Sequence, residues 1–389
     1  MTDSIEPAGD APRRLVAVVY NPLKAESREL RMAVEAAVAA ANASTSGSAG
    51  APTAVVEDAG SSTAQAGLAG SPIAESLTTE SLTTESLTTE SLTAEAAPWD
   101  SPLWLETTVD DAGHGLARRA VEDGADLVLA AGGDGTIRAV AAGLRGSGVP
   151  LGIIPLGTGN LLARNLGLPL TDLRASVRTA FSGVDKQIDV GVAELTRENG
   201  ASSEHVFLVM AGLGIDAAMI ANTNPQLKKR VGWLAYIDGG LRSIGTKKLH
   251  IHYTLPGHPP HSAHVSTILA GNCGVLPGNM ELMPDASLDD GELDIALLQP
   301  RTVFGWLLIW RKVTWENRVL RRSAFGRRII RYTNSDKATT LTYLRGPSVR
   351  VELDHVEQVE LDGDGFGEVA AAHFWADAGA LVVRMPRAA

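Results

Sequence analysis

From Leu127 to Val140 the chain reads LVLAAGGDGTIRAV, an apolar run followed by glycines, one carboxylate and a threonine. The run is short enough for a buried strand, and apolar residues then recur at helical spacing at Ile137, Val140 and Leu144. The pattern predicts a strand, a glycine turn and a helix. Glycines let the backbone pass close to a bulky anion, and the free amides of a helix start face it. This turn therefore suits a phosphate group.

Asp134 is the unusual member of this turn, because a lone carboxylate repels a polyphosphate unless a cation lies between them. We interpret Asp134 as a contact to a magnesium-bound nucleotide. Thr136 is expected to cap the following helix with its hydroxyl. The other expected phosphate-binding residues of the turn are Gly132, Gly133, Gly135 and Thr136 itself.

A second turn of the same kind follows, where the run Leu151–Pro155 continues into LGTGN and then LLARNL. Asn160 is expected to cap the new helix. Two such turns after consecutive strands would lie side by side at the carboxyl edge of a parallel sheet, where open α/β sheets bind ligands. Two tight turns without a ligand are the alternative, but the nucleotide site is favoured. Its residues in this turn would be Gly157, Thr158, Gly159 and Asn160.

The chain resembles the catalytic domain of diacylglycerol kinases at GGDGT (Gly132–Thr136), at PLGTGN (Pro155–Asn160) and at Leu162–Arg164. This group contains bacterial soluble lipid kinases and is related to sphingosine kinases. The resemblance extends, with gaps, from about Leu15 to the C-terminus. It implies transfer of the γ-phosphate of ATP to a lipid hydroxyl, with Mg²⁺ as cofactor and diacylglycerol as the leading acceptor.

Two other functions stay open. GGDGT alone is shared with NAD kinases, so an NAD kinase-like small-molecule kinase is one alternative. A non-catalytic nucleotide- or lipid-binding module is the other, and ATP binding without turnover on any lipid would favour it.

Strands and helices alternate in the first half, with a last helix expected at about 173–181, which predicts a nucleotide-binding α/β domain at 14–182 with a Rossmann-like, doubly wound parallel sheet. Short alternating runs, among them 206–211, 263–270 and 293–298, then predict an antiparallel β domain at 183–389. The resemblance implies that this second domain is a sandwich that receives the lipid, and its last residues are expected to pack back on the first domain. Residues 1–13 are predicted to be disordered. So is an insertion at 42–98, where SLTTE repeats with a period that fits neither helix nor strand.

Composition restricts the partners and the compartment. The formal net charge of -11 argues against general nucleic-acid binding. The single cysteine, Cys273, excludes an intrachain disulfide and favours the cytosol. No run reaches the roughly 18 apolar residues that a membrane span needs. We therefore expect a cytoplasmic protein, with peripheral contact to the inner face of the membrane and a homodimer as open alternatives.

Three further residues are candidates for nucleotide contact. The first strand ends at Asn21-Pro22, a turn that touches the nucleotide in the resembled family. Lys24 follows and is well placed to reach a phosphate, although a solvated loop lysine explains its position equally well. Thr108 stands at a strand end and is the third candidate.

The acidic turn Pro284–Asp294 is a candidate metal site, because clustered carboxylates and accessible carbonyls supply the hard oxygen ligands that magnesium prefers. The resembled family holds a structural magnesium at this motif. That implies Asp290 as a side-chain ligand, with Ser287 and Glu292 contributing through backbone or water. A plain acidic turn is the alternative.

A second acidic turn reads DGD from Asp362 to Asp364, where the resembled family has Asp-Gly-Glu. In that family the last carboxylate takes the proton from the lipid hydroxyl. Asp364 is one methylene shorter but keeps the chemistry, so we expect it to be the base. Asp362 is the alternative base.

The segment 303–331 combines tryptophans at near-helical spacing with a strongly basic composition. Such a helix can lie at an anionic membrane interface, where it would bring the enzyme to a lipid substrate. A core-packing helix with a solvated basic flank is the alternative.

Overall fold

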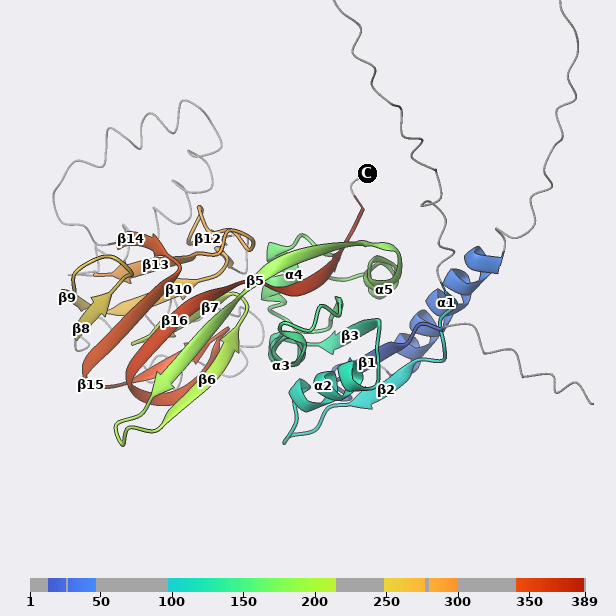
Figure 1. Cartoon of the computed structure of the whole chain (residues 1–389), viewed down its shortest axis with the longest axis horizontal. Coiled ribbons are helices and arrows are strands. Elements are labelled where there is room, and N and C mark those ends of the chain that lie inside the picture. Colours follow the sequence, from blue (N-terminus) through green and yellow to red (C-terminus); the bar gives the residue numbers. More distant parts are fainter. Residues whose placement is uncertain are drawn as a thin grey trace, which may run out of the picture.

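The computed structural model describes residues 13–25, 27–46, 97–214, 248–276, 280–299 and 341–387. Within these ranges, fourteen strands are hydrogen-bonded into one mixed sheet, and two short strands pair separately. Figure 1 shows a part that carries the helices beside a part made of strands. None of the helices in these ranges combines the length and apolar character needed to cross a bilayer.

The helix-bearing part contains a parallel sheet in the order β2-β1-β3-β4. Side chains alternate between its faces: Val18 and Leu129 lie in the cluster formed with α1 and α5, whereas Val19 and Val128 lie in the cluster formed with α2 and α3. Helices therefore cover both faces, as in a doubly wound sheet. The elements are β1 (Val16–Tyr20), α1 (Ser27–Ser46), β2 (Leu103–Glu106), α2 (His114–Glu122), β3 (Leu127–Gly132), α3 (Asp134–Leu144), β4 (Leu151–Pro155), α4 (Leu161–Asn165) and α5 (Leu173–Ser182).

The strand-rich part is antiparallel throughout its described ladders. Its interior is an apolar cluster in which Phe207 and Phe374 meet edge to face. The strands are β5 (Val184–Thr196), β6 (Ser202–Phe207), β7 (Met210–Leu213), β8 (Leu249–Thr254), β9 (His261–Val265), β10 (Thr267–Gly271), β11 (Val275–Leu276), β12 (Met280–Glu281), β13 (Leu293–Leu298), β14 (Leu341–Gly346), β15 (Ser348–Leu361) and β16 (Asp364–Met385).

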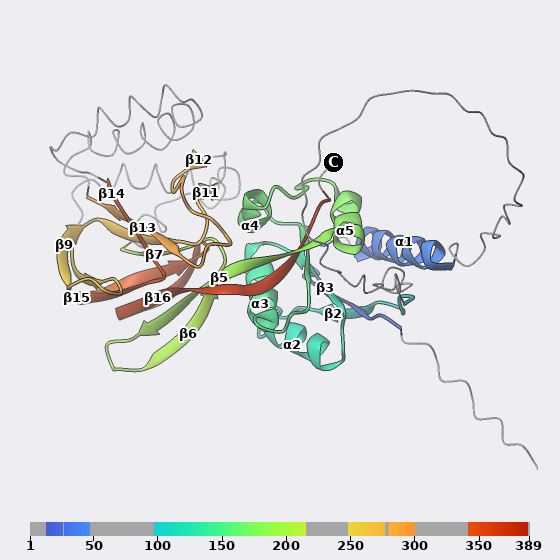
Figure 2. The same cartoon turned by 45° about the horizontal axis from the view of Figure 1, so that its top comes forward.

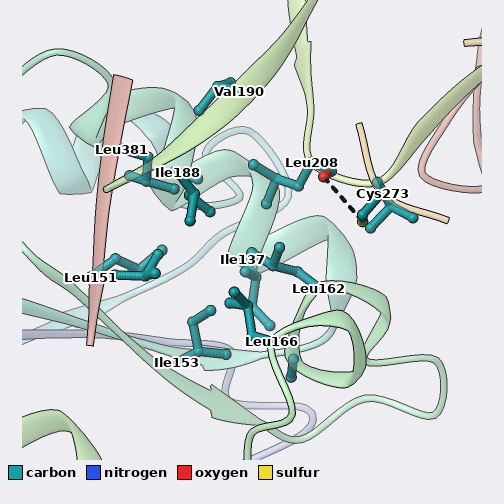
Figure 3. Packing of buried hydrophobic residues seen from close by; sticks show 14 of the residues in the cluster. Ile137, Leu151, Ile153, Leu162, Leu166, Ile188, Val190, Leu208, Cys273 and Leu381 are labelled. Carbon is teal, nitrogen blue, oxygen red and sulfur yellow. Dashed lines mark hydrogen bonds between the residues drawn. The ribbon is translucent and has the colours of Figure 1, made fainter. Parts of the chain in front are cut away.

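The last strand joins the two parts. β16 pairs with β5 along most of its 22 residues and then lies parallel to β4, where Val383 pairs with Leu151. Figure 2 shows both long strands passing from the strand-rich part to the helices. Figure 3 shows the core at this join, where Leu151, Ile188 and Leu381 pack together. The sheets predicted as separate are therefore one hydrogen-bonded sheet, because β16 is long enough to belong to both.

Two strands expected as continuous are interrupted. The run expected at 206–211 is divided into β6 and β7, because the Leu208 and Val209 amides donate to the Asp362 carboxylate instead of to a neighbouring strand. The run expected at 263–270 is divided at Ser266, whose amide donates to the Leu298 carbonyl. Both breaks depend on partners that are distant in the sequence.

The boundary of the predicted insertion was wrong at its first residues. Helix α1 continues through Ser46, and the Asn42 side chain forms two hydrogen bonds with the Trp99 backbone, at 2.7 and 3.0 Å. The two ends of the insertion are thus held together. Residues 47–96 of the insertion, and the whole segment 303–331, lie outside the described residues.

Candidate active site

The two glycine turns lie against each other at the carboxyl ends of β3 and β4. A Cβ atom on Gly157 would lie 2.8 Å from the Cα atom of Gly133, closer than real Cβ atoms approach a backbone. The Leu156 amide also donates to the Gly132 carbonyl at 2.8 Å. This approach requires glycine at position 157, and it brings the amides of both turns to one edge of the sheet.

Asp134 links the two turns. Its Oδ2 atom accepts from the Asn160 amide at 2.9 Å, and its Oδ1 atom accepts from the Leu161 amide at 2.5 Å. Amides at a helix start have no partner within the helix, so this carboxylate satisfies them with a favourable charge. Each oxygen keeps a second lone pair, and only these remain for the expected contact to a magnesium-bound nucleotide.

The two predicted side-chain caps were wrong. Helix α3 begins at Asp134, and Thr136 lies buried inside it, where no side-chain cap bond is formed. Asn160 does occupy the position before α4, with a φ of 48°, but its side chain turns back to the Gly157 backbone. Asn160 is not needed as the cap of α4, because the Asp134 carboxylate already accepts the hydrogen bonds of the amides at the start of that helix.

Lys24 lies over the first glycine turn. Its Nζ atom is 2.5 Å from the position that a Cβ atom on Gly133 would take. The loop that carries it is fixed by Asn21, whose side chain accepts from the Leu23 amide at 2.9 Å and whose own amide donates to the Ala131 carbonyl. An exposed ammonium group beside the amides of a glycine turn is an arrangement that attracts phosphate.

A pocket of about 550 Å³ opens beside Lys24 and Gly157. It is lined by α1, by the end of β4, and by the start of α5 with the loop that precedes it. The volume lies within the range of about 300–1,000 Å³ that is usual for small-molecule sites. Thr158 is exposed in the adjoining turn.

Thr108 is not among the residues that line this pocket. Its hydroxyl accepts from the Asp111 amide at 3.0 Å, and the Asp111 carboxylate accepts from amides at the start of α2. Thr108 therefore belongs to the turn that begins α2.

Asp364 reaches the first glycine turn from the far end of the chain. Strands β15 and β16 are joined by a two-residue turn, Asp362-Gly363, in which both φ angles are positive, as a tight hairpin requires. This turn leaves the Asp364 Oδ2 atom 3.3 Å from the position of a Cβ atom on Gly135. The Arg138 guanidinium holds it there by donating to Oδ2 at 2.7 Å and to the Leu361 carbonyl at 2.7 Å.

Asp362 has a different environment. It is buried, and its carboxylate accepts from the amides of Leu208, Val209 and Met210 at 2.8–3.1 Å. Burial raises the pKa of the Asp362 carboxyl, while nearby Arg138 and the three amides oppose that rise. Its hydrogen bonds fix the β6–β7 break against the β15–β16 hairpin, and thereby position Asp364.

The acidic turn at 284–294 encloses an arginine. The Arg345 guanidinium contacts the Asp290 carboxylate and forms an ion pair with Glu292 at 2.8 Å. Ser287 donates to Asp289 at 2.6 Å and does not face this pair. The Asp290 carboxylate, the expected side-chain ligand, is therefore paired with Arg345, and a Mg²⁺ ion there would have to displace the guanidinium. The contributions expected of Ser287 and Glu292 through backbone or water stay a prediction.

Burial also affects this turn. It raises the pKa of the Asp294 carboxyl to about 6, although Arg345 lies 3.8 Å away and acts in the opposite direction. Arg345 therefore offsets part of the negative charge of the turn, and Asp294 becomes protonated only as the pH falls through about 6.

Arg138 and Arg345 are the site residues that sequence reasoning missed. Arg138 follows Asp134 by one helical turn in the quoted stretch, which was a usable signal that it shares a helix face with the glycine turn. Nothing in the sequence pairs it with Asp364, which is 226 residues away. Arg345 gave no local signal, because its partners precede it by more than fifty residues.

Comparison with known families matches residues 87–193 to the diacylglycerol kinase catalytic domain. A Pseudomonas fluorescens protein named "Probable lipid kinase YegS-like" is 35% identical over 216 residues, which cover 54% of this chain and 68% of that protein. The diacylglycerol kinase of Bacillus subtilis is 28% identical over 273 residues, covering 69% of this chain and 80% of that protein. An uncharacterized Synechocystis protein is 27% identical, and the match spans about half of its length, 52%.

Solved structures give the same picture of the fold. A crystal structure of a diacylglycerol kinase from Bacillus anthracis superposes with a TM-score of 0.60 at 18% sequence identity, covering 97% of this chain and 99% of that chain. At this identity the likeness shows the fold alone. The family is shown by the sequence matches: this chain belongs to the diacylglycerol kinase catalytic-domain family.

Proposed function

We propose that this protein is an ATP-dependent lipid kinase that transfers the γ-phosphate of ATP to a lipid hydroxyl, with diacylglycerol as the leading acceptor. The observation that carries the proposal is the meeting of Asp364 with the first glycine turn, 3.3 Å from the Cβ position of Gly135. A carboxylate brought from the C-terminal strands to a phosphate-binding turn is placed to receive a proton from an acceptor hydroxyl.

Different residues of the site bind the nucleotide and accept the proton. The Lys24 ammonium holds the phosphate groups together with turn amides other than those of Leu156, Gly157 and Asn160, which donate within the protein. The pocket beside them accommodates the nucleoside. Mg²⁺, when bound, neutralises phosphate charge. The lipid hydroxyl oxygen forms a bond to the γ-phosphorus, the bond to the β-γ bridging oxygen breaks, and ADP leaves. Asp364 accepts the hydroxyl proton late in this loose transition state.

Asp364 suits the base better than Asp362 does. Its side chain is 57% exposed, whereas the Asp362 side chain is 3% exposed and accepts from three amides. A buried carboxylate with three fixed donors cannot turn toward a substrate without losing them. We therefore assign proton transfer to Asp364 and positioning to Asp362.

The remaining assignments extend this proposal. Residues 14–182 would form the nucleotide domain, and residues 183–389 would present the lipid. The acceptor enters from a membrane surface, so contact with the cytoplasmic face of the bilayer is expected, and the segment 303–331 is a proposed part of it.

One observation favours a non-catalytic module instead. Arg138 donates to Asp364 at 2.7 Å, so the carboxylate proposed as the base is already engaged in an ion pair within the protein. Nucleotide binding without phosphate transfer would be the outcome of that alternative.

Transfer of radiolabelled phosphate from ATP to a panel of lipids, with NAD included as an acceptor, distinguishes these functions. We expect labelled lipid and no labelled NAD. In Asp364→Asn, lipid labelling should fall by about 10²–10⁴-fold, the usual contribution of a general base, while ATP affinity is retained.

Asp100→Asn is the matched control, because Asp100 is an exposed aspartate paired with Arg13 outside the site. It should behave as wild type. Full turnover in Asp364→Asn would overturn the assignment of the base, and labelling of NAD in place of lipid would overturn the substrate class.

A further inference from the structure

A cluster of histidines lies on one face of the strands β9, β8 and β15. His250 and His252 are two residues apart on β8, so both side chains point to the same face. On β9, His264 pairs directly with His250, and Ser262 pairs directly with His252. On β15, Asp354 follows Leu353, which pairs with Ile251, so the register places Asp354 beside His250.

The side chains of this cluster converge. The His250 Nδ1 and Asp354 Oδ2 atoms are 2.7 Å apart, and the His252 Nε2 and Asp354 Oδ1 atoms are 3.4 Å apart. One ligand atom from each of these three residues lies within 4.8 Å of the other two. The His264 ring lies over the His250 ring, with 4.5 Å between centroids.

We propose that His250, His252 and Asp354 bind a divalent transition-metal ion of the Zn²⁺ type, with a water molecule as the fourth ligand. Imidazole nitrogen and carboxylate oxygen are ligands that Zn²⁺ accepts, and three of them with one water complete its usual tetrahedron. Two ligands about 2.0 Å from one ion lie about 3.3 Å apart at the tetrahedral angle. The 3.4 Å separation of His252 and Asp354 already has this value.

Neighbouring side chains orient the ligands. The Ser262 hydroxyl contacts the His252 Nδ1 atom at 2.9 Å, which orients the ring and leaves Nε2 facing Asp354. When an ion binds, it takes the place of the hydrogen bond between the His250 Nδ1 and Asp354 Oδ2 atoms, and the neutral imidazole carries its proton on Nε2.

The cluster is separate from the glycine turns. Figures 1 and 2 place β8 and β9 at the end of the strand-rich part that is remote from α3. Strand β9 pairs only with β8 among the described strands, so an ion bound here would fasten an edge hairpin to β15. Its expected effect is on stability and not on phosphate transfer.

Binding of Zn²⁺ and of Co²⁺ to the full-length, untagged, EDTA-treated protein tests the site. We expect one equivalent of Zn²⁺ by calorimetry, a visible absorption spectrum of tetrahedral Co²⁺, and a higher Tm when Zn²⁺ is present. His252→Ala and Asp354→Asn should each weaken Zn²⁺ binding at least tenfold.

His258→Ala is the matched control, since His258 lies in the β8–β9 turn outside the cluster. It should bind Zn²⁺ as wild type does. His250→Ala is the second variant if either of the first two fails to fold in EDTA, as judged by circular dichroism. Absence of a stoichiometric Zn²⁺ complex, or equal affinity in the cluster variants and the control, would overturn the site.

Discussion

At the scale of single residues, Arg138 decides how the proposed base is held. Its guanidinium is only 13% exposed and donates both to the Asp364 carboxylate and to the Leu361 carbonyl. It therefore fixes the hairpin and the base together. Hydrogen bonds to charged groups contribute about 1.5–3 kcal/mol each, which is enough to keep one orientation of Asp364 dominant.

Replacing Arg138 tests this positioning role. In Arg138→Gln we expect kcat for lipid phosphorylation to fall by about 10–100-fold, because about 2 kcal/mol of positioning is lost. The Kd for ATP should stay within about twofold, and Arg138→Lys should recover part of the loss by restoring the charge. Steady-state kinetics with a separate ATP-binding titration provide the measurement. An equal loss of ATP affinity would show that Arg138 acts on the nucleotide site instead.

At the scale of elements, the site depends on contact between two turns. Gly157 allows this contact, because a Cβ atom there would lie 2.8 Å from both the Gly133 Cα atom and the Asn160 Oδ1 atom. Asp134 then secures it by accepting the amides at the start of α4. The tight turn of the β15–β16 hairpin likewise sets the position of Asp364.

Gly157→Ala should separate the two turns. We expect a stability loss of about 1–3 kcal/mol, the usual result of overpacking, and at least a tenfold weaker affinity for ATP. Gly346→Ala is a suitable control, because a Cβ atom there would meet its nearest neighbour at an ordinary 3.4 Å. Urea unfolding and an ATP titration give the two readouts. Unchanged ATP affinity in Gly157→Ala would contradict a nucleotide site between the turns.

At the scale of the whole molecule, one sheet carries both halves of the site. β16 begins at the base, Asp364, and ends parallel to β4, the strand that precedes the second turn. Hydrogen bonds between the Asn42 side chain and the Trp99 backbone hold the two ends of the insertion together.

Replacement of residues 47–96 by a Gly/Ser linker of about twelve residues should therefore be tolerated. The linker has to return from Ser46 to the vicinity of Asn42, a helical distance of about 6 Å, which is far less than its reach. We expect a Tm within about 2 °C of the full chain, since longer loops cost little closure entropy. Thermal unfolding and the lipid-phosphorylation assay provide the comparison. Loss of folding would show that the insertion contributes to the core.

Local pattern was sufficient for the parallel strands, their helices and the two glycine turns. Strands β3, β4 and β13 and helix α5 lie where periodicity predicted them, because burial on one or both faces leaves its period in the sequence. Capping was harder to predict. Thr136 and Asn160 have side chains that can cap a helix. Thr136 lies inside α3, however, and the amides at the start of α4 donate to Asp134 of the other turn.

Contacts between residues that are far apart in the chain gave no local signal in the sequence. The breaks beside Leu208 and Ser266, the pairing of Arg138 with Asp364, and the enclosure of Arg345 by acidic residues all join residues that are far apart in the chain. These contacts form only between side chains that the folded sheet brings together. The period of apolar residues along the chain does not indicate which distant residues will meet. The residue types of the candidate site were therefore readable in order along the chain. Their meeting at one edge was settled by the fold, since the β15–β16 hairpin carries Asp364 to the first glycine turn.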